Sequence, residues 1–176
     1  RAVSTVYRLL EEGKKAATLG PIITTPGDGD LAARGCGLSA GQGDAPGYTL
    51  VIRSHGVPRE VEEKARSLGL SYVDATCPFV KKIHNLAERA GEQGQVFLLA
   101  GDKITEVQGI VGHCKGENFV IKSSEELVEL LKNHPELEKK PLAFAAQTTF
   151  HAGEWEKMRG NSEKTMYKRR SFCYNM

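Results

Sequence analysis

The sequence lacks long apolar runs. No stretch approaches the roughly eighteen continuous apolar residues that indicate a membrane-spanning helix. The N-terminal residues also lack the charged-then-apolar pattern of a secretory signal peptide. We therefore expect a cytoplasmic protein with neither a membrane span nor a membrane partner.

Cysteine is scarce as well. The four cysteines, Cys36, Cys77, Cys114 and Cys173, are scattered along the chain without CxxC spacing. In a reducing compartment such cysteines are free thiols by default, and metal ligation or catalysis is the exception. Their spacing alone identifies no metal site.

A charge excess of either sign is absent too. Lys plus Arg number 24 and Asp plus Glu number 22, a formal charge of +2 that gives no support to a nucleic-acid partner. With 176 residues and 40% hydrophobic content, the chain can bury the core of one large domain or of two small ones. An ordinary globular protein is the expectation.

What the chain does have is an alternation of apolar strand-like runs and helical patterns. The strand-like runs are continuously apolar, which is typical of parallel sheets covered on both faces. The predicted fold class is therefore α/β, and breaks near residues 77–80 and near residue 160 would divide the chain into similar small units. The clearest strand-like segments read YTLVIRSHG, SYVDATC, QVFLLAG, NFVIKS and PLAFAAQTT.

Polar residues follow these predicted strands. In open parallel sheets the ligand crevice lies beyond the carboxyl ends of the strands, so these are the positions where a site is expected. The segments are Arg53-Ser54-His55-Gly56, Asp74-Ala75-Thr76-Cys77, Gly101-Asp102 and Gln147-Thr148-Thr149.

Cys77 lies between a predicted strand and a predicted helix that begins with Pro78. Proline is favoured at the first helical position, so the sulfur would lie near the positive end of a helix dipole, which favours a thiolate. A thiolate suits a nucleophile or a soft-metal ligand. The alternative is a buried, inert thiol at a strand end, because free cysteine is among the most commonly buried residue types.

His55 lies in the segment RSHGVP, where Gly56 frees the backbone and Pro58 begins a helix. The imidazole and the helix-terminal amides could converge on an anion such as a diphosphate. The alternative is a histidine that packs under a turn. His84, inside a predicted helix at the edge of its apolar face, is interpreted as structural or solvated.

Two further segments offer acid–base or hydrogen-bonding groups. Glu106 lies in a glycine-rich stretch that we interpret as a loop after a strand, where a desolvated carboxyl could deliver a proton. A lone exposed glutamate is the alternative. Gln147, Thr148 and Thr149 could orient a polar substrate, or they could cap the helix that follows.

Six segments in a fixed order resemble one known family. They are RAVSTVYRLLEEGKK, TLGPII, VIRSHGVP, VDATCPFVKKIH, GD…EV.GI.GH and QTT. Together they closely resemble the 4-hydroxy-3-methylbut-2-enyl diphosphate reductase family, also called LytB or IspH. The match runs from Arg1 to about Thr149, and RSHGVP and DATCPFV are its most specific parts.

The resemblance implies a fold and an activity. The family is a three-lobed, trefoil-like α/β enzyme built from small parallel sheets around a [4Fe-4S] cluster. On this resemblance residues 1–77 and 78–160 would form two lobes, and residues 161–176 would begin a third lobe that is largely missing. The implied reaction is a two-electron reductive dehydroxylation of an allylic diphosphate, which yields isopentenyl and dimethylallyl diphosphates in isoprenoid biosynthesis. An external donor such as ferredoxin or flavodoxin would supply the electrons.

The resemblance also implies roles for residues of this chain. Cys77 would be the middle of three cluster ligands and Cys173, in FCYNM, the third, while the first would precede Arg1. His55 would bind the diphosphate. Glu106 would deliver a proton, and Thr148 would orient the substrate hydroxyl and act with Glu106 in catalysis.

The chain departs from the family at two substrate contacts. Thr24 stands where the family has a diphosphate-binding histidine, and the stretch ending in Glu106-Val107 lacks the histidine of the family's His-Pro-Glu-Val. A neutral side chain cannot supply the same charge-assisted hydrogen bonds. We therefore expect little or no turnover from this chain.

Two other functions are compatible with the same residues. The chain could be a non-catalytic α/β fragment that at most binds a diphosphate through His55. It could also be a thiol hydrolase that uses Cys77 with His55, but nothing in the sequence supplies an orienting partner or an oxyanion motif.

Overall fold

The computed structural model describes residues 2–18, 48–102, 104–166 and 172–174. The chain divides into two compact units, Arg1–Pro78 and Phe79–Met176. The predicted diphosphate contact at Thr24 lies outside the described residues.

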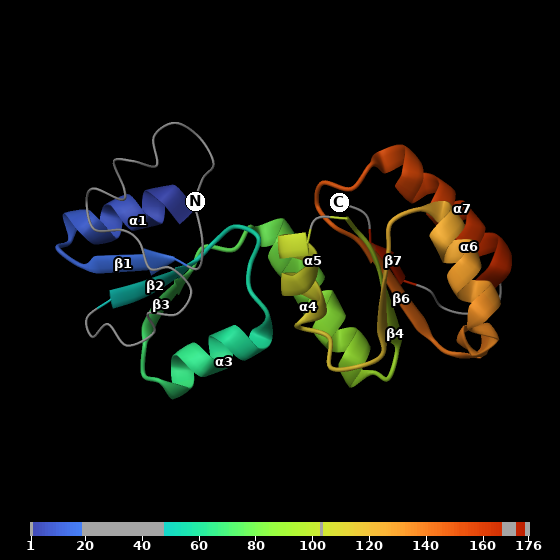
Figure 1. Cartoon of the computed structure of the whole chain (residues 1–176), viewed down its shortest axis with the longest axis horizontal. Coiled ribbons are helices and arrows are strands. Elements are labelled where there is room, and N and C mark those ends of the chain that lie inside the picture. Colours follow the sequence, from blue (N-terminus) through green and yellow to red (C-terminus); the bar gives the residue numbers. More distant parts are fainter. Residues whose placement is uncertain (1, 19–47, 103, 167–171, 175–176) are drawn as a thin grey trace. The chain divides into compact units, whose positions relative to one another are not determined.

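In its described residues, the first unit is a three-stranded parallel sheet with a helix on each face (Figure 1). The strands lie in the order β1-β2-β3, and α1 and α3 lie on opposite sides of them. Helix α1 packs on the sheet because its apolar residues, including Val6 and Leu9, face Ala16 and Val51 of the strands. The elements are α1 (Ala2–Glu11), β1 (Lys15–Thr18), β2 (Tyr48–Ile52), α3 (Arg59–Ser67) and β3 (Ser71–Asp74).

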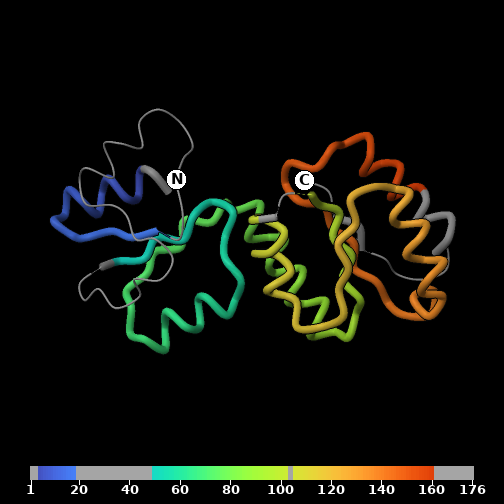
Figure 2. Tube along the Cα trace, viewed as in Figure 1, coloured from blue at the N-terminus to red at the C-terminus, as the bar shows by residue number. Residues whose placement is uncertain are grey.

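The second unit is a four-stranded parallel sheet in the order β5-β4-β6-β7, with two α-helices on each face. Figure 2 traces the path of the chain through it. The elements are α4 (Pro78–Glu92), β4 (Val96–Ala100), α5 (Ile104–Val111), β5 (Asn118–Ile121), α6 (Ser124–Asn133), the 3₁₀ helix η1 (Pro135–Lys139), β6 (Leu142–Ala146), α7 (Ala152–Met166) and β7 (Phe172–Tyr174).

Strand β4 shows why the sheet needs helices on both faces. All five of its residues are buried. Leu98 packs into the cluster formed with α6 and α7, whereas Phe97 and Leu99 pack into the cluster formed with α4 and α5. Successive side chains of a strand point to opposite faces, so a continuously apolar strand has to be covered twice. The predicted α/β class with small parallel sheets is confirmed.

The segment around Glu106 was interpreted as a glycine-rich loop, and this prediction is wrong. Residues Ile104–Val111 form helix α5. Ile110 is fully buried, and Val107 and Val111 pack against the same cluster as Phe97 of β4. Burial of this apolar face stabilises the helix despite its glycine and β-branched residues, which have low helix propensity.

Helix α6 begins with a side-chain cap. The Ser123 hydroxyl accepts a hydrogen bond from the Glu126 backbone N–H at 3.3 Å. The Glu126 carboxylate reaches back, but it accepts from the backbone N–H of Lys122 at 2.7 Å, one residue before the cap. Ser123 and Glu126 thus have the spacing of a capping box at this helix start.

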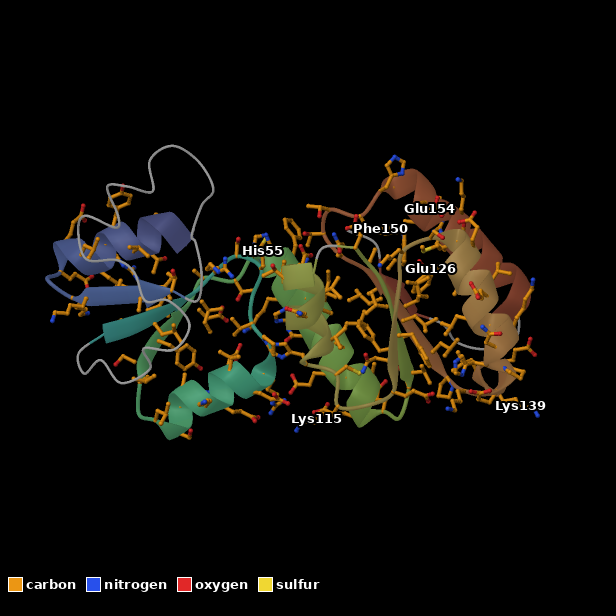
Figure 3. All side chains as sticks on the ribbon, in the orientation of Figure 1. His55, Lys115, Glu126, Lys139, Phe150 and Glu154 are labelled. Carbon is orange, nitrogen blue, oxygen red and sulfur yellow. The ribbon has the colours of Figure 1, made fainter. Side chains whose placement is uncertain are left out.

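A second carboxylate reaches the start of α6 from α7. Glu154, which Figure 3 labels, accepts a hydrogen bond at its Oε1 from the Ser124 backbone N–H at 2.7 Å. This bond, followed by the Ser124 hydroxyl and the Lys157 ammonium, lowers the pKa of the Glu154 carboxyl. Glu154 therefore stabilises the fold above its ordinary pKa, and this contribution disappears as the pH falls through its lowered value.

We expect Glu154→Gln to lower the melting temperature slightly near neutral pH and to have no effect in strong acid. The reason is that the ionised carboxylate, not the amide, complements the positive end of the helix. Thermal denaturation of both proteins across about pH 2 to about pH 7 measures the difference. Glu156→Gln, which alters only an exposed ion pair with Arg159, is the control. A difference that stays constant with pH would contradict the assignment.

The C-terminal part of the described chain belongs to the second sheet. Strand β7 pairs in parallel with β6, and Cys173 stands opposite Phe144 in the register. The Cys173 side chain lies outside the described residues. The beginning of a third lobe at residues 161–176 stays a prediction. No helix in the described part of the chain is long and apolar enough to cross a membrane.

Candidate functional site

In the second unit, two strand ends bring polar residues together. Ala100 of β4 and Ala146 of β6 are partners in the parallel register, so the residues that follow them leave the sheet at the same edge. The Gln147 backbone N–H donates to the Ala100 carbonyl at 2.8 Å. The Phe150 N–H donates to the Gln147 carbonyl at 3.1 Å and closes a turn over Thr148 and Thr149. Helix α5 begins beside this turn.

Glu106 and Thr148 form a doubly hydrogen-bonded pair at this edge. Glu106 is only 2% exposed, and its Oε1 accepts from the Thr148 backbone N–H at 2.7 Å. Its Oε2 accepts from the Thr148 hydroxyl at 3.1 Å. Thr148 itself is exposed. The alternative of a lone exposed glutamate is wrong, and one hydrogen bond links the buried carboxyl to the hydroxyl of an exposed residue.

Gln147 and Asp102 form a second pair beside the first. The Asp102 backbone N–H donates to Gln147 Oε1 at 2.9 Å, and Gln147 Nε2 donates to Asp102 Oδ1 at 3.0 Å. Gln147 Nε2 also donates to the Thr149 hydroxyl oxygen at 3.2 Å. These residues do not cap α7, because the bonds to its first turn come from the His151 carbonyl and ring. The helix-cap alternative is therefore wrong.

In the first unit, His55 lies in a turn at the end of β2. The turn is closed by the Gly56 N–H, which donates to the Arg53 carbonyl at 2.9 Å. Gly56 has a φ of 73°, a conformation that favours glycine. His55 is exposed (Figure 3), so it does not pack under the turn. Pro58, just before α3, makes no side-chain cap, and its carbonyl accepts from the Val61 N–H at 3.0 Å.

Cys77 lies at the end of the neighbouring strand β3, which pairs with β2. The loop before it is fixed by Asp74, whose carboxylate accepts from both the backbone N–H and the hydroxyl of Thr76. The Cys77 backbone N–H donates to the Ser54 carbonyl at 2.9 Å. The thiol is free and partly exposed, and Pro78 begins α4 directly after it. The alternative of a fully buried thiol is therefore wrong.

The described side chains contain no group of three His, Cys, Asp or Glu residues arranged to hold a metal ion. Cys77 fits a ligand position, since its thiol is accessible at a fixed loop. Cys114 does not, because burial raises the pKa of its thiol and its sulfur donates to the Gly116 carbonyl. The described residues thus supply one suitable thiol for an iron–sulfur cluster and not three.

His84 has a structural environment. It is 1% exposed, and its ring stacks on His113 with centroids 4.1 Å apart. Of the two interpretations of His84, the structural one is confirmed. The stack itself could not be predicted, since nothing in the sequence connects His84 with His113.

The comparison with protein families tests the resemblance noted in the sequence. A family model described as LytB protein matches residues 1–175. The chain belongs to the LytB family. The family predicted from RSHGVP and DATCPFV is therefore confirmed.

Curated relatives of this LytB chain include 4-hydroxy-3-methylbut-2-enyl diphosphate reductases. The chain is 37% identical over 155 residues to the reductase of that name from Aquifex aeolicus, a match covering 85% of this chain and 52% of that protein. It is 38% identical over 151 residues to the protein of that name from Geobacter metallireducens, covering 85% and 51%. The chain thus spans about half the length of the curated relatives it matches.

Solved structures agree with the LytB assignment. A structure of (E)-4-hydroxy-3-methyl-but-2-enyl diphosphate reductase matches with a TM-score of 0.80 at 32% identity, over 98% of this chain and 62% of that one. A Plasmodium falciparum reductase matches with a TM-score of 0.81 at 20% identity, over 97% and 54%, which supports the fold alone.

Proposed function

We propose that this chain is part of a 4-hydroxy-3-methylbut-2-enyl diphosphate reductase, an oxidoreductase of isoprenoid biosynthesis located in the cytoplasm. One observation supports it most strongly. A chain of the LytB family holds a buried carboxyl, Glu106, in a two-bond contact with the exposed Thr148 at a strand edge where substrates bind in such folds.

The reaction removes a hydroxyl group from an allylic carbon. The C–O bond breaks, the oxygen leaves as water after accepting a proton, and the allylic carbons accept two electrons and a second proton. Hydroxide is a poor leaving group, so a proton supplied during C–O cleavage lowers the barrier. Glu106 is the donor. In the structure the Thr148 hydroxyl donates to Glu106 Oε2. When Glu106 carries the proton, the same hydroxyl accepts from it and donates its own hydrogen to the substrate oxygen, which passes the proton on.

The diphosphate end is assigned to the first unit. His55 is exposed at the end of β2, and helix α3 begins shortly after it, behind Pro58. An imidazole N–H and backbone amides at a helix start are groups that bind phosphate. Two diphosphate-binding histidines of the family are absent, at Thr24 and just before Glu106, and for this reason we expect little or no turnover.

The family resemblance implies a [4Fe-4S] cluster, which when bound would supply the two electrons one at a time from an external donor such as ferredoxin or flavodoxin. Cys77 is the described residue that fits as a ligand, and Cys173 is a second candidate by resemblance alone. Because the described residues do not supply three thiols, only proton delivery and anion binding are assigned to residues of this chain.

Anaerobic reconstitution with iron and sulfide tests the proposal. Any iron–sulfur absorption and EPR signal that the wild-type chain shows after reduction should be lost in Cys77→Ser, because an alcohol is a far weaker ligand for iron than a thiolate. Cys114→Ser, which removes a thiol held by burial and by Gly116, is the matched control and should retain the cluster.

Two results would oppose the proposal. A cluster retained in Cys77→Ser would exclude Cys77 as a ligand. No cluster in any variant, together with pyrophosphate binding that is lost in His55→Ala, would favour the non-catalytic diphosphate-binding fragment instead. Isothermal titration with pyrophosphate in the absence of iron measures that binding.

A further inference from the structure

Thr148 makes both of its hydrogen bonds to one residue, Glu106, yet it sits in an exposed turn. An exposed turn residue ordinarily samples several conformations, and a proton relay works only while donor and acceptor stay in register. Other contacts must therefore hold the turn in place. The described contacts that do so converge on Gln147 and Thr149, the two residues flanking Thr148.

Gln147 is buried, with 3% of its surface exposed, and its side-chain amide is oriented unambiguously. The Asp102 backbone N–H can only donate, so the atom facing it is the amide oxygen. The Asp102 carboxylate accepts, so the atom facing it is the amide nitrogen. The second hydrogen on that nitrogen then points to the Thr149 hydroxyl oxygen at 3.2 Å. One amide thus connects the end of β4 with both sides of Thr148.

Gly101 allows this arrangement. A Cβ at Gly101 would lie 2.7 Å from Gln147 Oε1 and 2.7 Å from a methyl group of Val107. The absence of a side chain at Gly101 therefore lets the Gln147 amide and the first turn of α5 pack directly against the end of β4. Val107 directly follows Glu106 on α5, so the same contact connects the position of Gln147 to that of the buried carboxyl.

We propose that Asp102 is a positioning residue for the Glu106–Thr148 pair, acting through the side-chain amide of Gln147. The inference rests on the proposed function, because it assigns a role within proton delivery. Asp102 is exposed. Among the described residues, its carboxylate accepts a hydrogen bond from the side-chain amide of Gln147, which also donates to Thr149. A charged acceptor forms a stronger hydrogen bond than a neutral one, which suits a residue that fixes an amide at a surface.

The test uses the whole chain and needs no cluster. In Asp102→Ala, Gln147 Nε2 loses its charged acceptor, and we expect the Thr148 amide proton to exchange with solvent about tenfold faster, the effect of losing one net hydrogen bond. Asp102→Asn keeps a carbonyl oxygen in the same place and should restore slow exchange. Exchange at Thr148 is followed by NMR, with the amides of Leu98 and Phe144 reporting on the core.

The outcomes separate this inference from the proposed function. Faster exchange at Thr148 alone, rescued by Asp102→Asn, supports the inference whether or not the chain turns over substrate. Unchanged exchange in Asp102→Ala, or equal acceleration at Leu98 and Phe144, overturns it. Where the reconstituted chain reduces the allylic diphosphate, Asp102→Ala should lower kcat with KM unchanged, and an unchanged kcat also overturns it. Glu92→Ala, at the exposed end of α4, should change neither quantity.

Discussion

Replacing Glu106 by Gln is expected to leave the fold intact and to lower any reductase turnover by about 10²–10⁴-fold, the usual contribution of one positioned general acid. The amide oxygen of Gln can still accept from the Thr148 backbone N–H, and its NH₂ group can donate to the Thr148 hydroxyl. What is lost is the acidic proton. Turnover of the iron-reconstituted chain is measured anaerobically with the allylic diphosphate and a chemical reductant.

Glu106→Ala separates the structural from the chemical role of the carboxyl. It removes both acceptors of Thr148 and leaves a void at a 2% exposed position. We expect a loss of about 1–3 kcal/mol in the free energy of unfolding, the usual cost of removing a buried hydrogen-bonding partner. Urea denaturation measures it. Equal stability of wild type and Glu106→Ala would contradict the anchoring of Thr148, and full activity of Glu106→Gln would contradict the proton role.

The sequence predicted the edges of the sheets where the polar residues lie. Continuously apolar strands indicated parallel sheets, and parallel strands put their carboxyl ends at one edge, so the segments after β2 and β3, and those after β4 and β6, were expected to gather. That placement is confirmed within each unit. The roles of individual residues could not be derived in this way, because a histidine or cysteine at a strand end has several structural explanations. The family motifs were needed to choose among them.

The sequence did not predict the contact between Asp102 and Gln147. Asp102 and Gln147 are 45 residues apart, and their contact depends on Ala100 standing opposite Ala146. No local pattern specifies a strand register between segments that far apart. Glu106 was misplaced for a related reason. Its glycine-rich segment has low helix propensity, and burial of Ile110 against the sheet, which is a tertiary effect, decides that it is helical.

Gly101→Ala should disturb the contact between Gln147 and Asp102 without altering any polar atom. The added methyl group would lie 2.7 Å from both Gln147 Oε1 and Val107 Cγ2, closer than real side chains approach. Gln147 is buried and held by two bonds to Asp102, and Val107 is β-branched with few rotamers, so neither can yield cheaply. We expect a loss of about 1–3 kcal/mol in the free energy of unfolding, as for other overpacked cores.

Gly160→Ala is the matched control for that substitution. A Cβ at Gly160, within α7, would meet no atom within 4 Å, so the change should raise stability by about 0.5–1 kcal/mol through the better helix propensity of alanine. The pair therefore differs in the sign of the effect for the same chemical change. If Gly101→Ala is as stable as wild type, Gln147 has moved away from Asp102 at no cost, and the tight contact among β4, α5 and Gln147 does not fix the position of Thr148.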